Sequence, residues 1–278
     1  MRRRLAEQGV AQPEFAAVRT LHEARIAVDT IGLPAVLKPA DAAGRRGLFL
    51  LRFPDEVEAH LHAALAQSST HEAIVERYHD GLELTALAVA RGGHVVPFAL
   101  SDRLRPPGGF IVYPTKLFGD ALAEAEDTVV RALHALGVDD GITFAQLLAA
   151  DDATLILDVS PTVPDAMAKL ARHALGLDVT VPEEQAAPRF ERPVAIRFLT
   201  AEPGPLPVGR VRRIGSLEKV LAFPGVLEAD LSLSVGDTID PVRLDGDARS
   251  YVVATGDTNI EARERADAAA RLLDIEVW

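Results

Sequence analysis

The order in which short strands and helices follow one another is the feature that most constrains the fold of this chain. Short apolar segments typical of strands occur among amphipathic helical segments, and glycine or proline marks most of the boundaries. A strict alternation of strand and helix would favour a parallel sheet, but here several strands follow directly on one another. This irregular order predicts an α+β fold.

Hydrophobic periodicity and turn residues give the bounds of the expected elements. The expected helices are 2–8, 22–31, 54–66, 121–136, 166–175, 216–221 and 259–273. The expected strands are 14–19, 34–38, 47–52, 73–78, 82–91, 94–101, 143–150, 154–159, 194–199, 209–213, 227–233, 250–254 and 275–278. A run with two prolines and several acidic or amide residues, 182–188, predicts a boundary between one domain at 1–186 and another at 187–278.

Composition excludes several classes of protein. Hydrophobic residues make up 48% and charged residues 25% of the 278 positions, which is typical of a globular chain with a sizeable core. The net charge of −12 disfavours nucleic acid and anionic membranes as partners. The absence of cysteine excludes disulfides, zinc–thiolate sites and thiol nucleophiles. Arg91 interrupts the best apolar stretch, and the first ten residues lack the apolar segment of a signal peptide, so we expect a cytoplasmic protein.

The first motif that carries chemistry is Lys38-Pro39 at the end of an expected strand, followed by a small-residue loop with Gly44 and Gly47. A lysine at a strand end can bind phosphate while the backbone N–H groups of such a loop approach it closely. The alternative is a surface lysine before an ordinary turn.

The second motif runs from Glu76 to Glu83 and joins two expected strands through Asp80-Gly81. An adenine ring needs a backbone donor and acceptor on a linker, and a ribose needs an acceptor such as a carboxylate nearby. The alternative is a charged hairpin with both glutamates in solvent.

The third motif places Gln146 and Asp158 on two strands expected to pair across Asp151-Asp152, with Ser160 just beyond. Paired strands that present oxygen ligands can hold Mg²⁺ between nucleotide phosphates. The alternative is a plain hairpin with Asp158 as a polar terminus.

Taken in order, these motifs resemble the ATP-grasp superfamily. The Lys-Pro strand, the Glu-x-Tyr-x-x-Gly-x-Glu segment at 76–83 and the Gly-Ile-Thr strand at 141–143 carry the resemblance. The segments 223–226, 235–237 and 249–258 are similar to the closing domain of ATP-grasp L-amino-acid ligases. The resemblance implies an ATP-grasp fold, in which two α+β subdomains hold a nucleotide between them, at 1–186. It also implies a C-terminal α+β domain of amino-acid-ligase type at 187–278.

The resemblance also implies an ATP site. The family's lysine at the position of Lys38 contacts the α- and β-phosphates, its glutamate at Glu76 accepts from the adenine amino group, and its carboxylate at Glu83 binds the ribose. The backbone of Arg77 and Tyr78 matches the family's hinge, and the loop 40–47 matches the lid over the phosphates. The ATP-binding candidates are therefore Lys38, Gly44, Arg45, Gly47, Glu76, Arg77, Tyr78 and Glu83. Arg45 stands where a hydroxyl residue is usual, which changes how the lid closes.

The metal positions depart from the family pattern. The family usually has Glu, Glu and Asn where this chain has Gln146, Asp158 and Ser160, and an arginine where it has Thr162. We expect these three residues to form a weaker Mg²⁺ site, because they carry one formal charge rather than two. Lys169 and Arg172, on the following helix, are candidates to replace the arginine's charge.

The function implied is that of an ATP-dependent carboxylate–amine ligase, which forms an amide through an acyl-phosphate. ATP and Mg²⁺ would be its cofactors, and a small carboxylate and an amine its substrates. The alternative is a catalytically impaired nucleotide-binding subunit or regulatory module. A family chain usually has an additional N-terminal α/β domain and a second ATP-contacting lysine before the segment similar to 1–10. We therefore expect this domain to be missing here. Two kinds of partner remain as alternatives: a second copy of the chain in a homodimer, or a separate chain that supplies the N-terminal domain.

Overall fold

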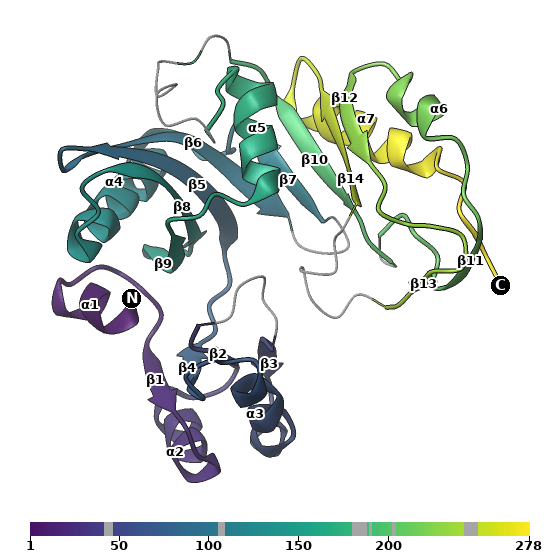
Figure 1. The fold of residues 1–278 in the computed structure, drawn as a ribbon. Helices are drawn as coiled ribbons and strands as arrows, with labels where there is room; N and C mark the ends of the chain where they lie inside the picture. Colours follow the sequence, from purple (N-terminus) through teal and green to yellow (C-terminus); the bar gives the residue numbers. More distant parts are fainter. Residues whose placement is uncertain (42–46, 105–108, 180–187, 189–190, 202–203, 242–249) are drawn as a thin grey trace. The chain divides into compact units, whose positions relative to one another are not determined.

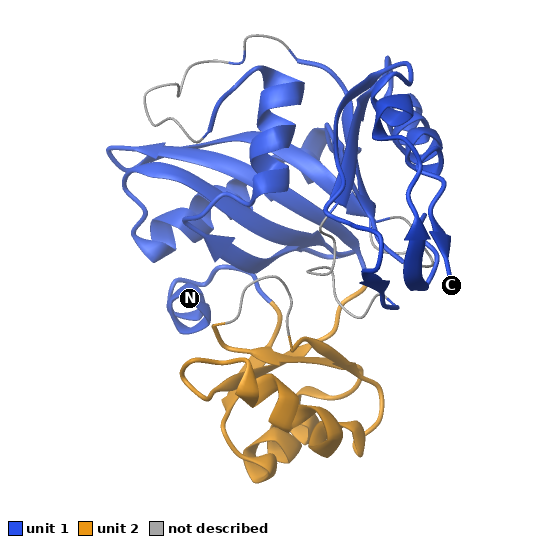
Figure 2. Ribbon diagram, turned by 45° about the vertical axis from the view of Figure 1, so that its right-hand side comes forward, with its two compact units in different colours: residues 1–12, 81–242, 248–278 blue, residues 13–80, 243–247 orange. Residues whose placement is uncertain are grey.

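The computed structural model describes residues 1–41, 47–104, 109–179, 188, 191–201, 204–241 and 250–278. The described residues form two compact units (Figure 2). The large unit contains 1–12, 81–241 and 250–278, and the small unit contains 13–80. Each unit has its own sheet and its own hydrophobic core.

The small unit is a four-stranded antiparallel sheet with two helices packed on one face (Figure 1). The strand order is β1 (Phe15–Val18), β4 (Ala73–Arg77), β2 (Ala35–Pro39) and β3 (Phe49–Leu51). The helices are α2 (Leu21–Ile31) and α3 (Glu56–Ala66). Helix α2 begins at a capping box, because Thr20 Oγ1 accepts from Glu23 N at 3.2 Å and Glu23 Oε2 accepts from Thr20 N at 3.1 Å. Apolar residues of both helices bury the alternate strand residues, including Leu37 and Val75, so the other residues of β2 and β4 point to the opposite face.

The large unit is built on an eight-stranded antiparallel sheet (Figure 1). Its strand order is β12 (Val226–Asp230), β14 (Ser250–Thr255), β10 (Val194–Leu199), β7 (Phe110–Tyr113), β6 (His94–Leu104), β5 (Leu82–Arg91), β8 (Gly141–Ala149) and β9 (Thr154–Ser160). Helices α4 (Gly119–Leu136) and α7 (Asn259–Arg271) pack against one face, and α5 (Asp165–Leu175) packs against the other. The face assignment follows from alternation along the strands: Leu84 and Leu147 lie in the core with α4, whereas Leu87 and Phe144 lie in the core with α5.

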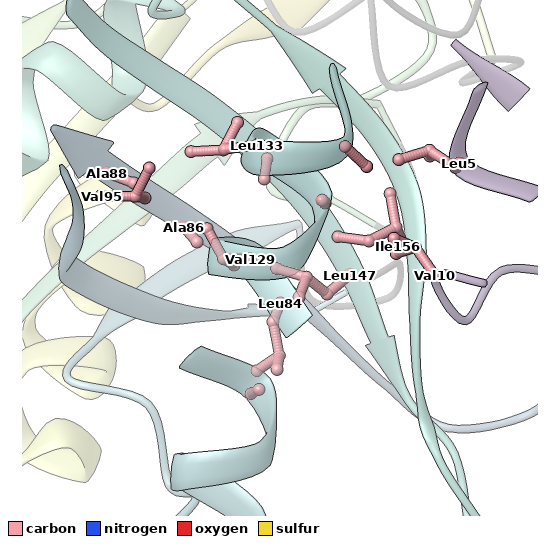
Figure 3. Packing of buried hydrophobic residues seen from close by; sticks show 14 of the residues in the cluster. Leu5, Val10, Leu84, Ala86, Ala88, Val95, Val129, Leu133, Leu147 and Ile156 are labelled. Atoms are coloured by element: carbon pink, nitrogen blue, oxygen red, sulfur yellow. The ribbon is translucent and has the colours of Figure 1, made fainter. Parts of the chain in front are cut away.

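The N-terminal segment packs into the same core as α4. Helix α1 (Arg2–Glu7) buries Leu5 completely, and Val10 follows it into the cluster beside Ile156 (Figure 3). Gly9 ends the helix with a φ of 65°, a left-handed conformation that glycine adopts without strain. The start of the chain is therefore an integral part of the large unit.

A smaller three-stranded sheet completes the large unit. Strand β11 (Gly209–Arg213) pairs antiparallel with β13 (Thr238–Ile239) and with β15 (Glu276–Val277). The short helix α6 (Leu217–Leu221) contributes Val220 to the core that these strands share with Leu273.

The α+β class expected from the sequence is confirmed, since the sheets are antiparallel and the helices follow irregularly. Strands β7 and β13 were missed. The charged hairpin given as the alternative for the segment from Glu76 to Glu83 is wrong, because β4 and β5 belong to different sheets. The boundary expected after 186 falls outside the described residues, and it stays a prediction; strand β10, beyond it, pairs with β7 in the eight-stranded sheet. Across the described ranges, every helix is too short or too polar to cross a membrane.

Candidate functional site

Lys38 and Glu76 form an ion pair on the helix-free face of the small unit's sheet. Strands β2 and β4 pair so that Val36 lies opposite Glu76 and Lys38 opposite Ile74, which makes Lys38 and Glu76 diagonal neighbours on one face. Lys38 Nζ lies 2.9 Å from Glu76 Oε2, and their side chains are 23% and 5% exposed. Because both groups are largely withdrawn from water, the attraction between their charges is screened less than in a surface ion pair. The alternative of a solvated Glu76 is therefore wrong, whereas the alternative of a lysine before an ordinary turn is not tested, because 42–46 lie outside the described residues.

The two ends of the predicted phosphate loop are fixed by local contacts. Ala40 N donates to Glu72 O at 2.9 Å, and Asp41 Oδ2 accepts from Ser69 N at 3.1 Å. At the far end, Gly47 has a φ of 72°, and a Cβ there would lie 3.0 Å from Pro39 Cγ. Glycine is thus required both by the backbone conformation and by close packing. Gly44 and Arg45, the other two candidates of the loop, lie outside the described residues.

The predicted hinge is anchored within the small unit. Arg77 N donates to Glu14 O at 2.9 Å, and Tyr78 N donates to Pro34 O at 3.2 Å. The Arg77 guanidinium also pairs with Glu14, at 2.8 Å between Nη2 and Oε2, and the Tyr78 hydroxyl donates to Asp80 Oδ1 at 3.0 Å. These two backbone N–H groups are therefore engaged in the protein itself, and an adenine ring would have to use other groups of the segment. The adenine-binding role of this hinge stays a prediction.

A row of polar side chains crosses four strands of the large unit. Thr85 on β5 lies opposite Ser101 on β6 and Gln146 on β8, and Gln146 lies opposite Asp158 on β9. Directly opposite residues of an antiparallel ladder project to the same face, so these four side chains share the α5 face. We call Ser101, Thr85, Gln146 and Asp158 the polar row. Glu83 lies two residues before Thr85, on the same face, and is only 6% exposed, so solvation of this glutamate is also wrong.

The inner half of the polar row is buried and its outer half is open. Thr85 Oγ1 and Ser101 Oγ are 2.7 Å apart, and neither residue is accessible to solvent. Gln146 is half-buried and Asp158 is exposed at the outer strand of the sheet. The row therefore brings a carboxylate and an amide together where a ligand can reach them.

A β-bulge puts Asp158 in this row. Leu147 pairs with Ile156, but Gln146 pairs with Asp158, so Leu157 is one extra residue in β9. If Leu157 instead paired regularly with Gln146, Asp158 would lie opposite Ala145, on the α4 face, because a shift by one residue reverses the side of every side chain. Sequence reasoning missed the bulge, which nothing in the local residue pattern marks.

Ser160 continues the same face beyond Asp158, opposite Phe144. Its hydroxyl is engaged in a tight turn: Ser160 Oγ accepts from Thr162 N and donates to Thr162 O, both at 3.1 Å. One lone pair of this oxygen is left for a further contact.

The three predicted metal positions offer one carboxylate, one amide and one hydroxyl to Mg²⁺. The described ranges contain no group of three or more His, Asp or Glu side chains that could hold a metal. Asp158 and Gln146 lie directly opposite one another, however, and Mg²⁺ is commonly bound by one or two carboxylates together with substrate phosphates. The donor set therefore fits Mg²⁺ carried by a nucleotide, and does not fit a cage built from protein ligands alone.

The cations of α5 have carboxylate partners elsewhere in the large unit. The carboxylate of Glu228 on β12 accepts hydrogen bonds from Lys169 Nζ at 2.7 Å, from His173 Nε2 at 2.8 Å and from the Tyr251 hydroxyl at 2.7 Å. Burial acts to raise the pKa of Glu228, but hydrogen bonds from His173, Lys169 and Tyr251 outweigh it and lower the pKa to about 2. Arg172 lies 3.8 Å from Asp178. The suggestion that Lys169 or Arg172 supplies the charge that Thr162 lacks thus gains no support from these contacts.

Two families of known proteins match successive parts of the chain. Residues 2–181, more than half of the chain, match the family described as carbamoyl-phosphate synthase L chain, ATP binding domain. Residues 197–277 match the family described as L-amino acid ligase C-terminal domain 2. A curated relative, the uncharacterized protein y4rH of Sinorhizobium fredii, is 28% identical over 97% of this chain, which spans 59% of that relative's length.

Solved structures share the fold. The L-amino acid ligase from Bacillus licheniformis matches with a TM-score of 0.81 at 16% identity, over 100% of this chain and 71% of that chain. The biotin carboxylase domain of the 2-oxoglutarate carboxylase from Hydrogenobacter thermophilus, in complex with MgADP, ADP and bicarbonate, matches with a TM-score of 0.71 at 15% identity. That match covers 99% of this chain and 65% of the other. Identities this low relate these proteins by fold.

Proposed function

The chain belongs to the family of the carbamoyl-phosphate synthase L chain ATP-binding domain, and from this premise we propose that it binds ATP with Mg²⁺ for ATP-dependent carboxylate–amine ligation. Small carboxylate and amine molecules are the proposed substrates, and the cytoplasm is the proposed location. The two matched families, one for nucleotide binding and one named for amino-acid ligases, support this combination.

The observation that carries the proposal is the Lys38–Glu76 ion pair. A lysine at a strand end is long and flexible, and its ammonium normally stays in bulk water. Here the 2.9 Å contact with a buried carboxylate holds the ammonium near the protein surface, on the strand that ends at Pro39. An ammonium fixed in this way gives up less conformational entropy when it binds a phosphate. It also provides local positive charge in a chain whose net charge is −12.

The proposed roles are those that the resemblance to ATP-grasp proteins implies for each residue. Lys38 binds the phosphates, and Glu76 orients Lys38 and accepts a hydrogen bond from the adenine amino group. Glu83, nearly buried at the start of β5, accepts from the ribose. Asp158, with Gln146 opposite, would hold Mg²⁺, which would supply positive charge for the phosphates.

The proposed reaction has two steps. A carboxylate oxygen of the substrate attacks the γ-phosphorus of ATP, and the bond from this phosphorus to the β–γ bridging oxygen breaks. ADP departs, and the substrate becomes an acyl-phosphate. An amine nitrogen then attacks the acyl carbon, loses a proton and displaces inorganic phosphate to form an amide. Bound Mg²⁺ would supply charge neutralisation at the transferring phosphoryl group. The protein's own contribution is to position the phosphates through Lys38 and the metal ligand through Asp158.

A nucleotide-binding module without ligase activity is the second candidate. Two observations favour it: the amide of Gln146 brings no charge, and the hydroxyl of Ser160 is engaged with Thr162. Losing one preorganised electrostatic contact typically costs about 10²–10³ in rate, so a depleted metal site would slow phosphoryl transfer while nucleotide still binds.

Two measurements on the same protein separate these candidates. Calorimetric titration with ATP, with and without Mg²⁺, measures nucleotide binding. Release of phosphate from ATP across a panel of amino acids measures ligase chemistry. The enzyme predicts amino-acid-dependent release, the module predicts Mg²⁺-dependent binding without release, and the absence of binding in the folded protein would refute both.

A further inference from the structure

The bulge that places Asp158 needs support, because it lies on the outermost strand of the eight-stranded sheet. A bulge leaves an extra residue without its ladder partner, and an edge strand offers unpaired backbone groups to its outer side. The carbonyls of Ile156 and Leu157 are therefore the groups that must be bound if β9 is to keep this shape.

Arg2 binds both carbonyls. Its Nη1 donates to Ile156 O at 2.7 Å and its Nη2 donates to Leu157 O at 2.8 Å. The residue is only 6% exposed, although it is a charged residue at the start of the chain. The two donors of the planar guanidinium thus span the bulge, because they bind the carbonyls of the two peptide groups that flank Leu157.

Arg2 is itself held in place by its neighbours. Gln12 Oε1 accepts from Arg2 Nη1 at 3.1 Å, and Gln12 Nε2 donates to Arg2 O at 2.9 Å. Ile156 N donates to Ala11 O at 2.9 Å, so the segment that carries Gln12 lies along the outer side of β9. The buried Leu5 and the neighbouring Val10 fix α1 and the segment after it against Ile156 (Figure 3).

From this arrangement we propose that Arg2 is a positioning residue for the metal site. Through Leu157 it keeps the bulge in β9, and the bulge keeps Asp158 on the same face as Gln146. This inference rests on the proposed function, since Asp158 is a metal ligand only if the chain binds Mg²⁺–nucleotide. Arg2 acts through the backbone, and does not itself touch the ligand.

Arg2→Lys tests the inference because it keeps the charge and loses the fork that spans the bulge. We expect it to weaken the apparent affinity for Mg²⁺ in ATP titrations by about 10–100-fold, the usual effect of losing a group that orients a metal ligand. ATP binding without Mg²⁺ is expected to stay as in the wild type, because Lys38 and Glu76 are unchanged. The double variant with Asp158→Asn is expected to be no weaker than Asp158→Asn alone.

Arg4→Ala is the matched control. Arg4 lies on the same helix and also donates to a backbone carbonyl, from Nε to Ala135 O at 3.0 Å, but its target is in α4 rather than in β9. This variant is expected to keep the wild-type dependence on Mg²⁺. An equal loss in Arg2→Lys and Arg4→Ala would overturn the inference by showing that only the docking of α1 matters.

A readout without ligand keeps the inference separate from the proposed function. Amide hydrogen exchange of the protein alone is expected to be faster at 155–160 in Arg2→Lys than in the wild type and in Arg4→Ala. Unchanged protection at 155–160 would overturn the role of Arg2, whatever the protein binds. If exchange at 155–160 is faster in Arg2→Lys but the protein binds no nucleotide, the proposed function is refuted. Arg2 would then have only a structural role, and this result would also overturn the inference.

Discussion

Lys38 Nζ lies 2.9 Å from Glu76 Oε2, across two neighbouring strands of the small unit's sheet. Glu76 is almost fully buried, and the ammonium of Lys38 faces its carboxylate. The proposed role of Lys38 in phosphate binding follows from this pair, because the carboxylate fixes where the ammonium lies.

Removing the ammonium alone is expected to destabilise the protein more than removing both charges of this pair. Lys38→Ala leaves a buried carboxylate without this ammonium, and we expect the free energy of unfolding to fall by about 1.5–3 kcal/mol. Lys38→Ala combined with Glu76→Gln removes the buried charge as well, so it should recover part of that loss. Urea unfolding of the wild type, both single variants and the double variant measures the coupling between the two residues. Strictly additive effects would contradict the account.

Gly47→Ala is expected to destabilise the small unit in two ways. The left-handed backbone with a φ of 72° costs a non-glycine residue about 1–2 kcal/mol, and the new Cβ would lie 3.0 Å from Pro39 Cγ. Gly137→Ala is the control, because Gly137 has the same φ of 72° and a Cβ added there would meet no described atom within 4 Å. Gly47→Ala should therefore lose more stability in urea unfolding than Gly137→Ala. Equal losses would show that the packing against Pro39 is unimportant.

Restoring the missing carboxylate should strengthen the metal site. Gln146→Glu places a second charge directly opposite Asp158, and Ser160→Asn supplies an amide oxygen in place of a hydroxyl that is engaged with Thr162. We expect the double variant to bind ATP more tightly than the wild type in the presence of Mg²⁺, and no more tightly in its absence. Calorimetry at several Mg²⁺ concentrations measures both. A gain that is independent of Mg²⁺ would contradict the assignment of these positions as ligands.

The Glu228 network should make stability depend on acid pH. The pKa of Glu228 is lowered in the folded protein to about 2 from an ordinary value of 4.5. A lowered folded pKa contributes stability that is fully present above the unfolded value and is lost as pH falls toward about 2. Its neighbours Lys169, His173 and Tyr251 all donate to the charged form.

Glu228→Gln therefore tests the network. We expect it to cost about 1.5–3 kcal/mol near pH 6, the scale of hydrogen bonds to a charged group. The difference from the wild type should shrink steadily between pH 4.5 and pH 2 in urea unfolding. A difference that stays constant over this range would mean that Glu228 stabilises the fold by packing rather than by charge.

The sequence predicted the architecture well because its information is local. Thr20 and Glu23 mark the start of α2, and Asp151-Asp152 marks the turn between β8 and β9. The resemblance to ATP-grasp proteins is confirmed by the matched families, and the ATP-grasp fold by the solved structures. Strand β7 was missed because its four residues are all buried and therefore show no alternation of apolar and polar side chains. It also lies between Gly109 and Pro114, which are typical of a loop.

The features that were missed depend on residues far apart in the chain. Arg2 reads as part of a basic N-terminus, and its partners at 156 and 157 lie more than 150 residues away. The bulge at Leu157 is a matter of strand register, which the residue types of β8 and β9 do not encode on their own. The sequence named Lys38 and Glu76 as members of one site but did not predict that they pair with each other.

Titration of the wild type and of Lys38→Ala with ATP and Mg²⁺ is the most direct test of the central claim, with Lys219→Ala on α6 as the control for loss of one lysine. The account predicts that the wild type and Lys219→Ala bind ATP with the same affinity. It predicts that Lys38→Ala, checked to be folded, binds more weakly by about 1.5–3 kcal/mol, the scale of a charge-assisted contact. Equal affinity of Lys38→Ala and the wild type, or no binding by a folded wild type, would contradict it.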